Sequence, residues 1–446
     1  MRYLMIPAIL STILVFTPSA HGENPGNRST TATVETLIEQ LGNKDFHVRE
    51  SASKSLSAMG IDILPALRRS RSTLDPEVRR RLEELIPPLE RAVALTPRRI
   101  TLHMNNKTSR DVLAEFSKQT GYKLATWPDP QANGEKEKAV YTFHFDKLTF
   151  WEALDKLCET TGLVLQQNYG DDSLRLFYQD CYVPFVCYNG PFRVVATGFN
   201  YSRNNNFGQL PRNPIAPSQQ TYEALQVNLM VAVEPKLPIL RLGMVKVLSA
   251  EDDDGHSMLP ISGADPNEWA GTRHYYGGYY RNYVQSTQAN LVWPSKTSKT
   301  VKSMKGLIPV TLLAEQKPTV VTDKLLSAKS RKFQAGPASF TFEDVSGPAG
   351  NQYQVKMSVA EEARDGNNDY SQIQSLQQRI EVQDEKGNKI PSYFNMVNWH
   401  GPSSAQFTMT IQPSPPKVGP PSKLVYYSWV LMEHEVVFEF KDLPLP

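Results

Sequence analysis

Two histidines occupy matching places in a repeated stretch of the sequence, and they are the first residues whose spacing suggests chemistry. His103 lies in "TLHMNNKTSRDVLAEFSKQTG" (101–121), and His144 lies in "TFHFDKLTFWEALDKLCETTG" (142–162). Imidazole is a common zinc ligand, and two rings on neighbouring strands could share an ion. The sequence shows no third ligand beside them. We therefore expect two solvated or partner-facing histidines, with no metal and no cofactor.

Two runs of carboxylates have spacings that a cation site would need. "EDDDGH" (251–256) contains Asp252 and Asp254, and "DGNND" places Asp365, Asn367 and Asp369 at alternate positions, as at the start of a calcium loop. The second run lacks the glycine and the final glutamate of such a loop. The first run also fits a plain Asp-Gly hairpin turn. We predict no metal at either run.

An aromatic loop, "RHYYGGYYRNY" (273–283), can present stacking faces to a sugar or a flat amphipathic surface to a protein. A long loop lying over its own sheets is the alternative. Its candidate partner-binding residues are Arg273, Tyr275, Tyr276, Tyr279, Tyr280, Arg281 and Tyr283.

A second candidate surface is a group of arginines in the first hundred residues. Its members are Arg68, Arg69, Arg71, Arg79, Arg80 and Arg81. Such a basic patch would attract acidic protein, anionic polysaccharide or lipid headgroups. A solvated helix face is the plainer interpretation.

No catalytic motif accompanies these candidates. The sequence contains no G-x-S-x-G, H-E-x-x-H, C-x-x-C or phosphate-binding glycine loop. The net charge of +2 gives no overall attraction to nucleic acid, and no nucleic-acid partner is expected. The sequence therefore favours a protein that binds over one that catalyses.

The N-terminus predicts export. Arg2 precedes the apolar run Leu4–Phe16, and Ala20-His21-Gly22 resembles a signal-peptidase site, so 1–22 is expected to be a signal peptide. An N-terminal membrane anchor is the alternative, and no later segment reaches membrane-spanning length. Cys181 and Cys187 could pair in an oxidising compartment only if Pro184 turns the chain. Cys158 is expected to be a small core residue.

The region 33–96 reads as helices. "DFHVRE" at Asp45 and "DPEVRR" at Asp75 match at Asp, Val and Arg, and Asp75-Pro76-Glu77 is a strong helix start. Helix pairs repeating at this period resemble HEAT-type units. Two visible units are too few for a free-standing solenoid.

The histidine repeat predicts two β-α-β units in 98–179. In each unit a strand leads to an amphipathic helix that starts near Thr108 or Thr149 and ends at Gly121 or Gly162. Each unit has one apolar face, so the two should cover each other, with the histidines outside. The pattern "TSRDVLAEFSKQTGYKL" followed by "TFWEALDKLCETTGLVLQ" resembles the short N-terminal domain of secretins and TonB-dependent receptors. The resemblance implies a domain that docks protein partners in the cell envelope.

From Cys181 onward the pattern is all β, with strands separated by Pro, Gly, Asn and Asp clusters. We expect two immunoglobulin-like β-sandwiches, 181–322 and 323–446, with one large sandwich as the alternative. The fold class is thus multi-domain α+β.

Together these features predict an exported, non-catalytic protein of the periplasm, cell surface or extracellular space. It would be a scaffold of several interaction modules with envelope proteins as partners. The alternative is a carbohydrate-binding or carbohydrate-active β-sandwich protein that uses the loop 273–283.

Overall fold

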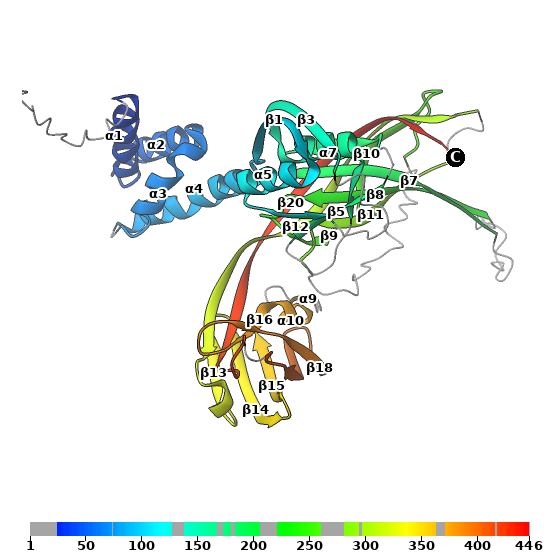
Figure 1. Ribbon diagram of the computed structural model, residues 1–446. Coiled ribbons are helices and arrows are strands. Elements are labelled where there is room, and N and C mark those ends of the chain that lie inside the picture. Colours follow the sequence, from blue (N-terminus) through cyan, green and yellow to red (C-terminus); the bar gives the residue numbers. More distant parts are fainter. Residues whose placement is uncertain are drawn as a thin grey trace, which may run out of the picture. The chain divides into compact units, whose positions relative to one another are not determined.

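The computed structural model describes residues 25–73, 75–126, 138–166, 173–179, 183–205, 221–259, 281–293, 297–362, 371–414 and 417–445. The chain is a mixed α+β protein built mostly of strands in several antiparallel sheets. It divides into two compact units, 1–93 and 94–446, whose elements are labelled in Figure 1. The expected signal peptide lies outside the described residues.

Helices make up the described part of the first unit. The helices pack around one hydrophobic core, in which Leu41, Leu56 and Leu82 are fully buried. The helices are α1 (Pro25–Gln40), α2 (Phe46–Ala58), η1 (Gly60–Ile63), α3 (Leu64–Ser70) and α4 (Pro76–Leu95).

The repeated Asp-x-x-Val-Arg motif builds the same helix start twice. Asp45 accepts a hydrogen bond from the amide of His47 at the start of α2, and Asp75 accepts one from the amide of Glu77 at the start of α4. In both copies the arginine reaches back six residues to a backbone carbonyl, from Arg49 to Asn43 O (2.8 Å) and from Arg79 to Thr73 O (2.9 Å). The sequence match therefore reflects a structural role.

The second unit begins with the histidine repeat. Strands β1 and β3 pair antiparallel, while β5 lies between β2 (parallel to it) and β4 (antiparallel). Thr108 and Thr149 form capping boxes, and Gly121 and Gly162 end the helices at φ 75° and 70°, in the left-handed region that glycine adopts most readily. The predicted starts and ends are confirmed. The elements are β1 (Arg99–Thr108), α5 (Ser109–Thr120), β2 (Lys123–Thr126), β3 (Val140–Thr149), α7 (Phe150–Thr161), β4 (Leu163–Gln166) and β5 (Ser173–Tyr178).

The predicted inward face of the repeat is also confirmed. Leu102 and Phe143 are buried, and both helices contribute to the same hydrophobic core, which includes Leu113, Phe116, Trp151, Leu154 and Leu157. His103 and His144 are exposed on the opposite side of their strands. Three residues from later strands, Ala232, Tyr283 and Val284, belong to this core as well.

Two sheets share the next core. One has the order β11-β8-β7-β6, and the other the order β10-β12-β20-β16-β17, with β9 also paired to β12. Apolar residues from both sheets meet in one cluster, for example Val227 of β8 and Phe438 of β20. The strands are β6 (Val186–Asn189), β7 (Phe192–Asn205), β8 (Thr221–Val233), β9 (Ile239–Leu242), β10 (Lys246–Asp252), β11 (Val284–Leu291), β12 (Thr300–Thr322) and β20 (Lys423–Pro444).

A further core lies under a sheet of order β13-β14-β15-β19-β18. Leu325, which follows the end of β12, is fully buried in it. The remaining elements are η2 (Leu325–Ser327), β13 (Lys332–Ala335), β14 (Ala338–Ala349), β15 (Gln352–Glu361), α9 (Ser371–Gln374), α10 (Leu376–Arg379), β16 (Ile380–Gln383), β17 (Lys389–Ile390), β18 (Ser392–Trp399) and β19 (Ser404–Ile411).

Strands β12 and β20 connect these two cores. They pair antiparallel from Thr300–Pro444 at one end to Thr322–Leu424 at the other. Val310 and Val436 lie in the first of the two cores, whereas Leu424 lies in the second. The expected boundary at 322/323 coincides with the end of β12, but β20 returns to the first core. Strand β20 therefore contributes to both cores.

Candidate functional site

The structure brings the two repeat histidines together. His103 and His144 are direct partners across β1 and β3, with ring centroids 6.0 Å apart. The Nε2 atom of His103 lies 2.8 Å from Asp146 Oδ1, and that of His144 lies 2.9 Å from Asn105 Oδ1. All four residues are exposed. They form an open polar surface, which we call the histidine face.

The acidic turn at 251–256 contains the one group in the described part of the chain that could hold an ion. The ligand atoms of Asp252, Asp254 and His256 lie within 4.8 Å of one another. Asp252 is buried and accepts hydrogen bonds from Ser298 Oγ (2.6 Å) and His256 N (2.7 Å), while Asp254 accepts one from Thr297 Oγ1 (2.7 Å). Burial acts to raise the pKa of Asp252, but the bonds from Ser298 and His256 outweigh it and lower the pKa to about 2. The ionised carboxylate thus already has donors that hold the turn.

Several predicted site residues lie outside the described residues. They are Arg273, Tyr275, Tyr276, Tyr279 and Tyr280 of the aromatic loop, and Asp365, Asn367 and Asp369 of the second acidic run. Two of the loop's candidate residues, Arg281 and Tyr283, are described. The backbone amide of Arg281 donates to Gln378 Oε1 (2.9 Å), and Tyr283 is 8% exposed. Tyr283 packs in the core of the repeat and is not part of an exposed surface.

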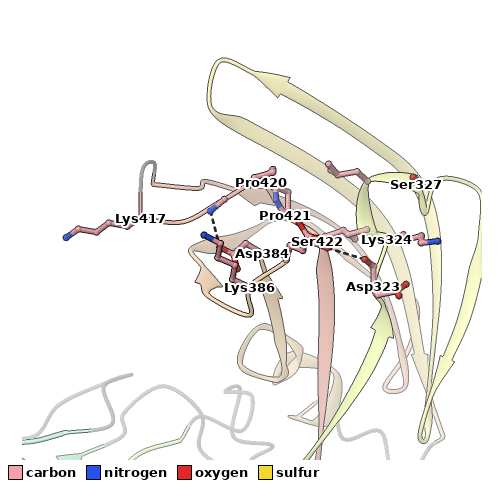
Figure 2. Close-up of a pocket in the computed structure, with 13 residues that line it drawn as sticks. Asp323, Lys324, Ser327, Asp384, Lys386, Lys417, Pro420, Pro421 and Ser422 are labelled. Carbon is pink, nitrogen blue, oxygen red and sulfur yellow. Dashed lines mark hydrogen bonds between the residues drawn. The ribbon is translucent and has the colours of Figure 1, made fainter.

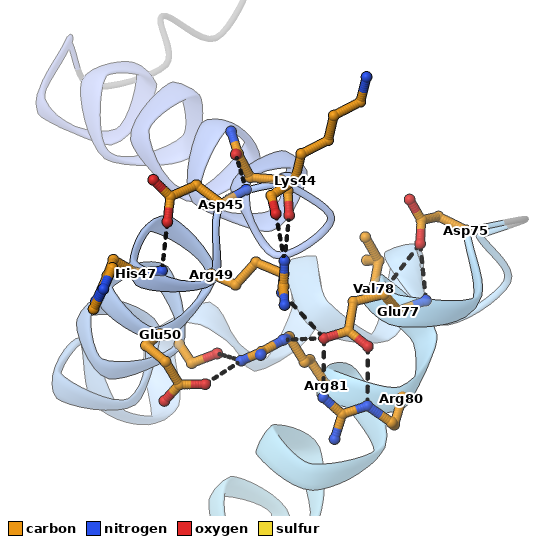
Figure 3. A network of polar contacts seen from close by, with 12 residues as sticks. Lys44, Asp45, His47, Arg49, Glu50, Asp75, Glu77, Val78, Arg80 and Arg81 are labelled. Carbon is orange, nitrogen blue, oxygen red and sulfur yellow. Dashed lines mark hydrogen bonds and ion pairs between the residues drawn. The ribbon is translucent and has the colours of Figure 1, made fainter.

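Three arginines of the helical unit, Arg49, Arg80 and Arg81, are paired with carboxylates, as Figure 3 shows. One carboxylate, that of Glu77, lies 3.3 Å from Arg49 Nε, 2.9 Å from Arg80 Nη2 and 2.7 Å from Arg81 Nε. Hydrogen bonds from Arg80 and then Arg81 lower the pKa of Glu77 to about 2. Arg81 is buried and also binds Glu50 at 2.9 Å. It joins α2 to α4 and is not a surface group.

Two further ion pairs involve arginines of the predicted basic patch. Arg68 pairs with Glu90 at 2.9 Å, and Arg80 also pairs with Glu84 at 2.6 Å, four residues along its helix. The pair of Arg68 and Glu90 joins α3 to α4, whereas Glu84 lies at helical spacing from Arg80. Arg69 and Arg71 are exposed.

A cavity of about 470 Å³ opens beside the core that lies under the sheet β13-β14-β15-β19-β18, and Figure 2 shows its lining. Asp384 accepts hydrogen bonds from Asn388 N (2.8 Å) and Gly419 N (3.0 Å), and bonds led by the Asn388 side chain lower its pKa to about 2. In the figure the ammonium ends of Lys324 and Lys417 extend away from each other. The carboxylate serves the local turn, so the cavity lacks a converging set of polar groups.

Two polar clusters attach the histidine repeat to β6–β8, and neither was predicted. In the first, Glu234 is fully buried at the end of β8. It accepts hydrogen bonds from Arg98 N and Tyr122 OH, both at 2.9 Å, and lies 3.8 Å from Lys236 Nζ. Burial raises the pKa of Glu234. This side chain ties the first strand and the first helix of the repeat to β8.

The second cluster is centred on Asp155 of α7. Its Oδ2 accepts hydrogen bonds from Arg193 Nε of β7 and Tyr188 OH of β6, both at 2.7 Å. Nearby, Trp151 Nε1 donates to Pro191 O at 2.8 Å. No local sequence pattern could reveal these contacts, because their members are 33 to 40 residues apart.

The structure describes two of the three cysteines. Cys158 is half-buried against the core of the repeat, as expected for a small core residue. Cys187 carries a free thiol, and Cys181 lies outside the described residues.

The whole chain shows little similarity to known proteins. No protein-family model matches it, and no curated protein matches it. One solved structure, "The crystal structure of the conserved domain protein from Bacillus anthracis", matches 56% of this chain and 88% of its own at 9% identity. Its TM-score of 0.15 is too low to carry an argument about fold or function. Separately, none of the helices among the described residues has the length and apolar character needed to cross a membrane.

Proposed function

We propose that this chain is an exported, non-catalytic scaffold of the cell envelope that binds protein partners through several modules. The modules are HEAT-like helical repeats, a secretin-type repeat domain at 98–179 and two immunoglobulin-like β-sandwiches. Its location is the periplasm, the cell surface or the extracellular space. The signal-like N-terminus and the resemblance of the repeat motivate this proposal.

The observation that carries the proposal is how the described part of the chain uses its buried charges. Each one binds a group on another element or in its own turn. Glu234 and Arg193 join the repeat to β6–β8, and Arg81 joins two helices. Glu361 pairs with Arg379 at 2.8 Å, and both bind Tyr426. Charges used this way fix modules against each other, which suits a scaffold better than an active site.

The histidine face is the surface we assign to partner contact. It is polar, exposed and built on a two-stranded sheet whose other side is anchored in a core. Hydrogen-bonding side chains on a rigid support are suited to fixing the orientation of a partner.

The test is site-specific photo-crosslinking in the cells that make the protein. A photoreactive residue at Asn105, on the histidine face, should give discrete adducts in the envelope fraction. The same residue at Glu362, also exposed, is the matched control and should give a different pattern or none. Adducts confined to the cytoplasm would contradict the location. Saturable binding of purified protein to a glycan array, with no adduct at Asn105, would favour the carbohydrate-binding alternative.

A further inference from the structure

A cleft of about 670 Å³ has walls from both the histidine repeat and the sheet β11-β8-β7-β6. One wall is β4 with α7, and the other is β6 with the residues before it. Its apolar lining includes Leu163, Leu165 and Val186, and its polar lining includes Asp155, Glu159 and Arg193. This size is in the range of ligand-binding sites.

Both walls end in the edge of a sheet. Strand β4 is the last strand of β2-β5-β4, and β6 is the last strand of β11-β8-β7-β6, as far as the described residues show. Edge strands offer backbone N–H and C=O groups that pair readily with an added strand.

The register shows which backbone groups face the cleft. Gln179 N donates to Gly162 O, so Gly162 and Gln179 form a hydrogen-bonded pair. In an antiparallel ladder such pairs alternate with pairs that are not hydrogen-bonded, so Val164 makes the next bonds to β5. The N–H and C=O groups of Leu163 and Leu165 therefore point to the open edge. Both residues line the cleft.

The same reasoning applies to the opposite wall. Ala196 N donates to Phe185 O, so Cys187 makes the next bonds to β7, and the backbone groups of Val186 and Tyr188 point outward. These two residues also line the cleft. Backbone groups that point away from the neighbouring strand thus belong to residues of both walls.

Arg193 adds a polar feature to this cleft. Its side chain is 5% exposed and its Nε is bound to Asp155. Its Nη1 is buried and, within the described part of the chain, has no hydrogen-bond partner. A buried donor without an acceptor costs free energy, and a carbonyl oxygen in the cleft would offer an acceptor.

We propose that this cleft binds an extended segment of a partner polypeptide, which adds as a strand to the open edge of β4 or β6. Open strand edges select an extended backbone, because only a chain with regularly spaced N–H and C=O groups can pair with them. The apolar lining favours Val, Ile or Leu at alternate positions of the segment. Arg193 neutralises Asp155, which leaves Glu159 to favour a basic residue near one end. This inference rests on the proposed function and deepens it by naming the kind of partner.

The experiment uses the purified full chain and a phage-displayed library of linear dodecapeptides. Selected peptides should have alternating apolar residues, and their affinity is measured by fluorescence anisotropy. Leu165→Pro and Val186→Pro each remove one outward N–H without breaking a ladder bond. At least one should weaken binding about ten-fold or more. Leu165→Ala and Val186→Ala remove the same side chains but keep the N–H, and each should bind more tightly than its proline counterpart.

A second readout does not depend on the fold of any variant. Single N-methylation along the selected peptide should weaken binding at every second residue, because one edge of a strand uses alternate amides. Failure to select any peptide would overturn the proposal. So would equal binding by both proline variants and the unchanged chain, or a methylation scan without alternation. Because the assay uses purified components, peptide binding without envelope adducts would reject the location alone, and adducts without peptide binding would reject the cleft alone.

Discussion

Truncation of one leucine in either copy of the repeat should loosen both copies. Leu113 and Leu154 occupy equivalent positions in α5 and α7, are 4% and 1% exposed, and belong to one core. Leu→Ala removes three buried carbon atoms at about 0.8 kcal/mol each. With the cavity left behind, the cost in free energy of unfolding should be about 2–5 kcal/mol for each substitution.

Native-state hydrogen exchange with mass spectrometry reports the opening free energy of each helix separately. In Leu113→Ala, protection should fall in α7 as well as in α5, and Leu154→Ala should give the reciprocal result, since the two helices share their core. His103→Ala is the control, and its exposed side chain should leave both helices within about 0.5 kcal/mol of the original protein. Loss of protection confined to the substituted helix would refute the shared core and, with it, the reason given for the repeat.

Three further predictions follow from other parts of the chain. N-terminal sequencing of the exported protein should begin near Glu23, and an intact Met1 in the cytoplasm would contradict export. Glu77→Gln should lower the melting temperature of the helical unit at pH 7. Because its folded pKa is depressed to about 2 from 4.5, this difference should be complete above pH 4.5 and vanish as pH falls through 2. Zinc, calcium and copper should leave the melting temperature within a few degrees. A larger rise that His103→Ala plus His144→Ala abolishes would show a metal site on the histidine face.

The sequence predicted those parts of the fold that depend on local pattern. Thr108 and Gly121 mark a helix because capping and the left-handed turn are properties of single residues and their near neighbours. The inward side of β1 followed from strict alternation, in which a shift of one residue would expose Leu102 and bury His103. The run of arginines did not by itself show that Glu77 pairs with Arg80 and Arg81, or that Arg81 is buried.

Only the tertiary structure decided which distant residues meet. Tyr122 and Glu234 are 112 residues apart, and their contact depends on how the repeat packs on β8. The pairing of β12 with β20 joins residues more than a hundred positions apart, so no periodicity in either strand reveals it. The cleft between β4 and β6 likewise depends on two edges that different sheets leave open. Local periodicity records which face of an element is apolar, whereas the choice of partner for that face is a property of the whole folded chain.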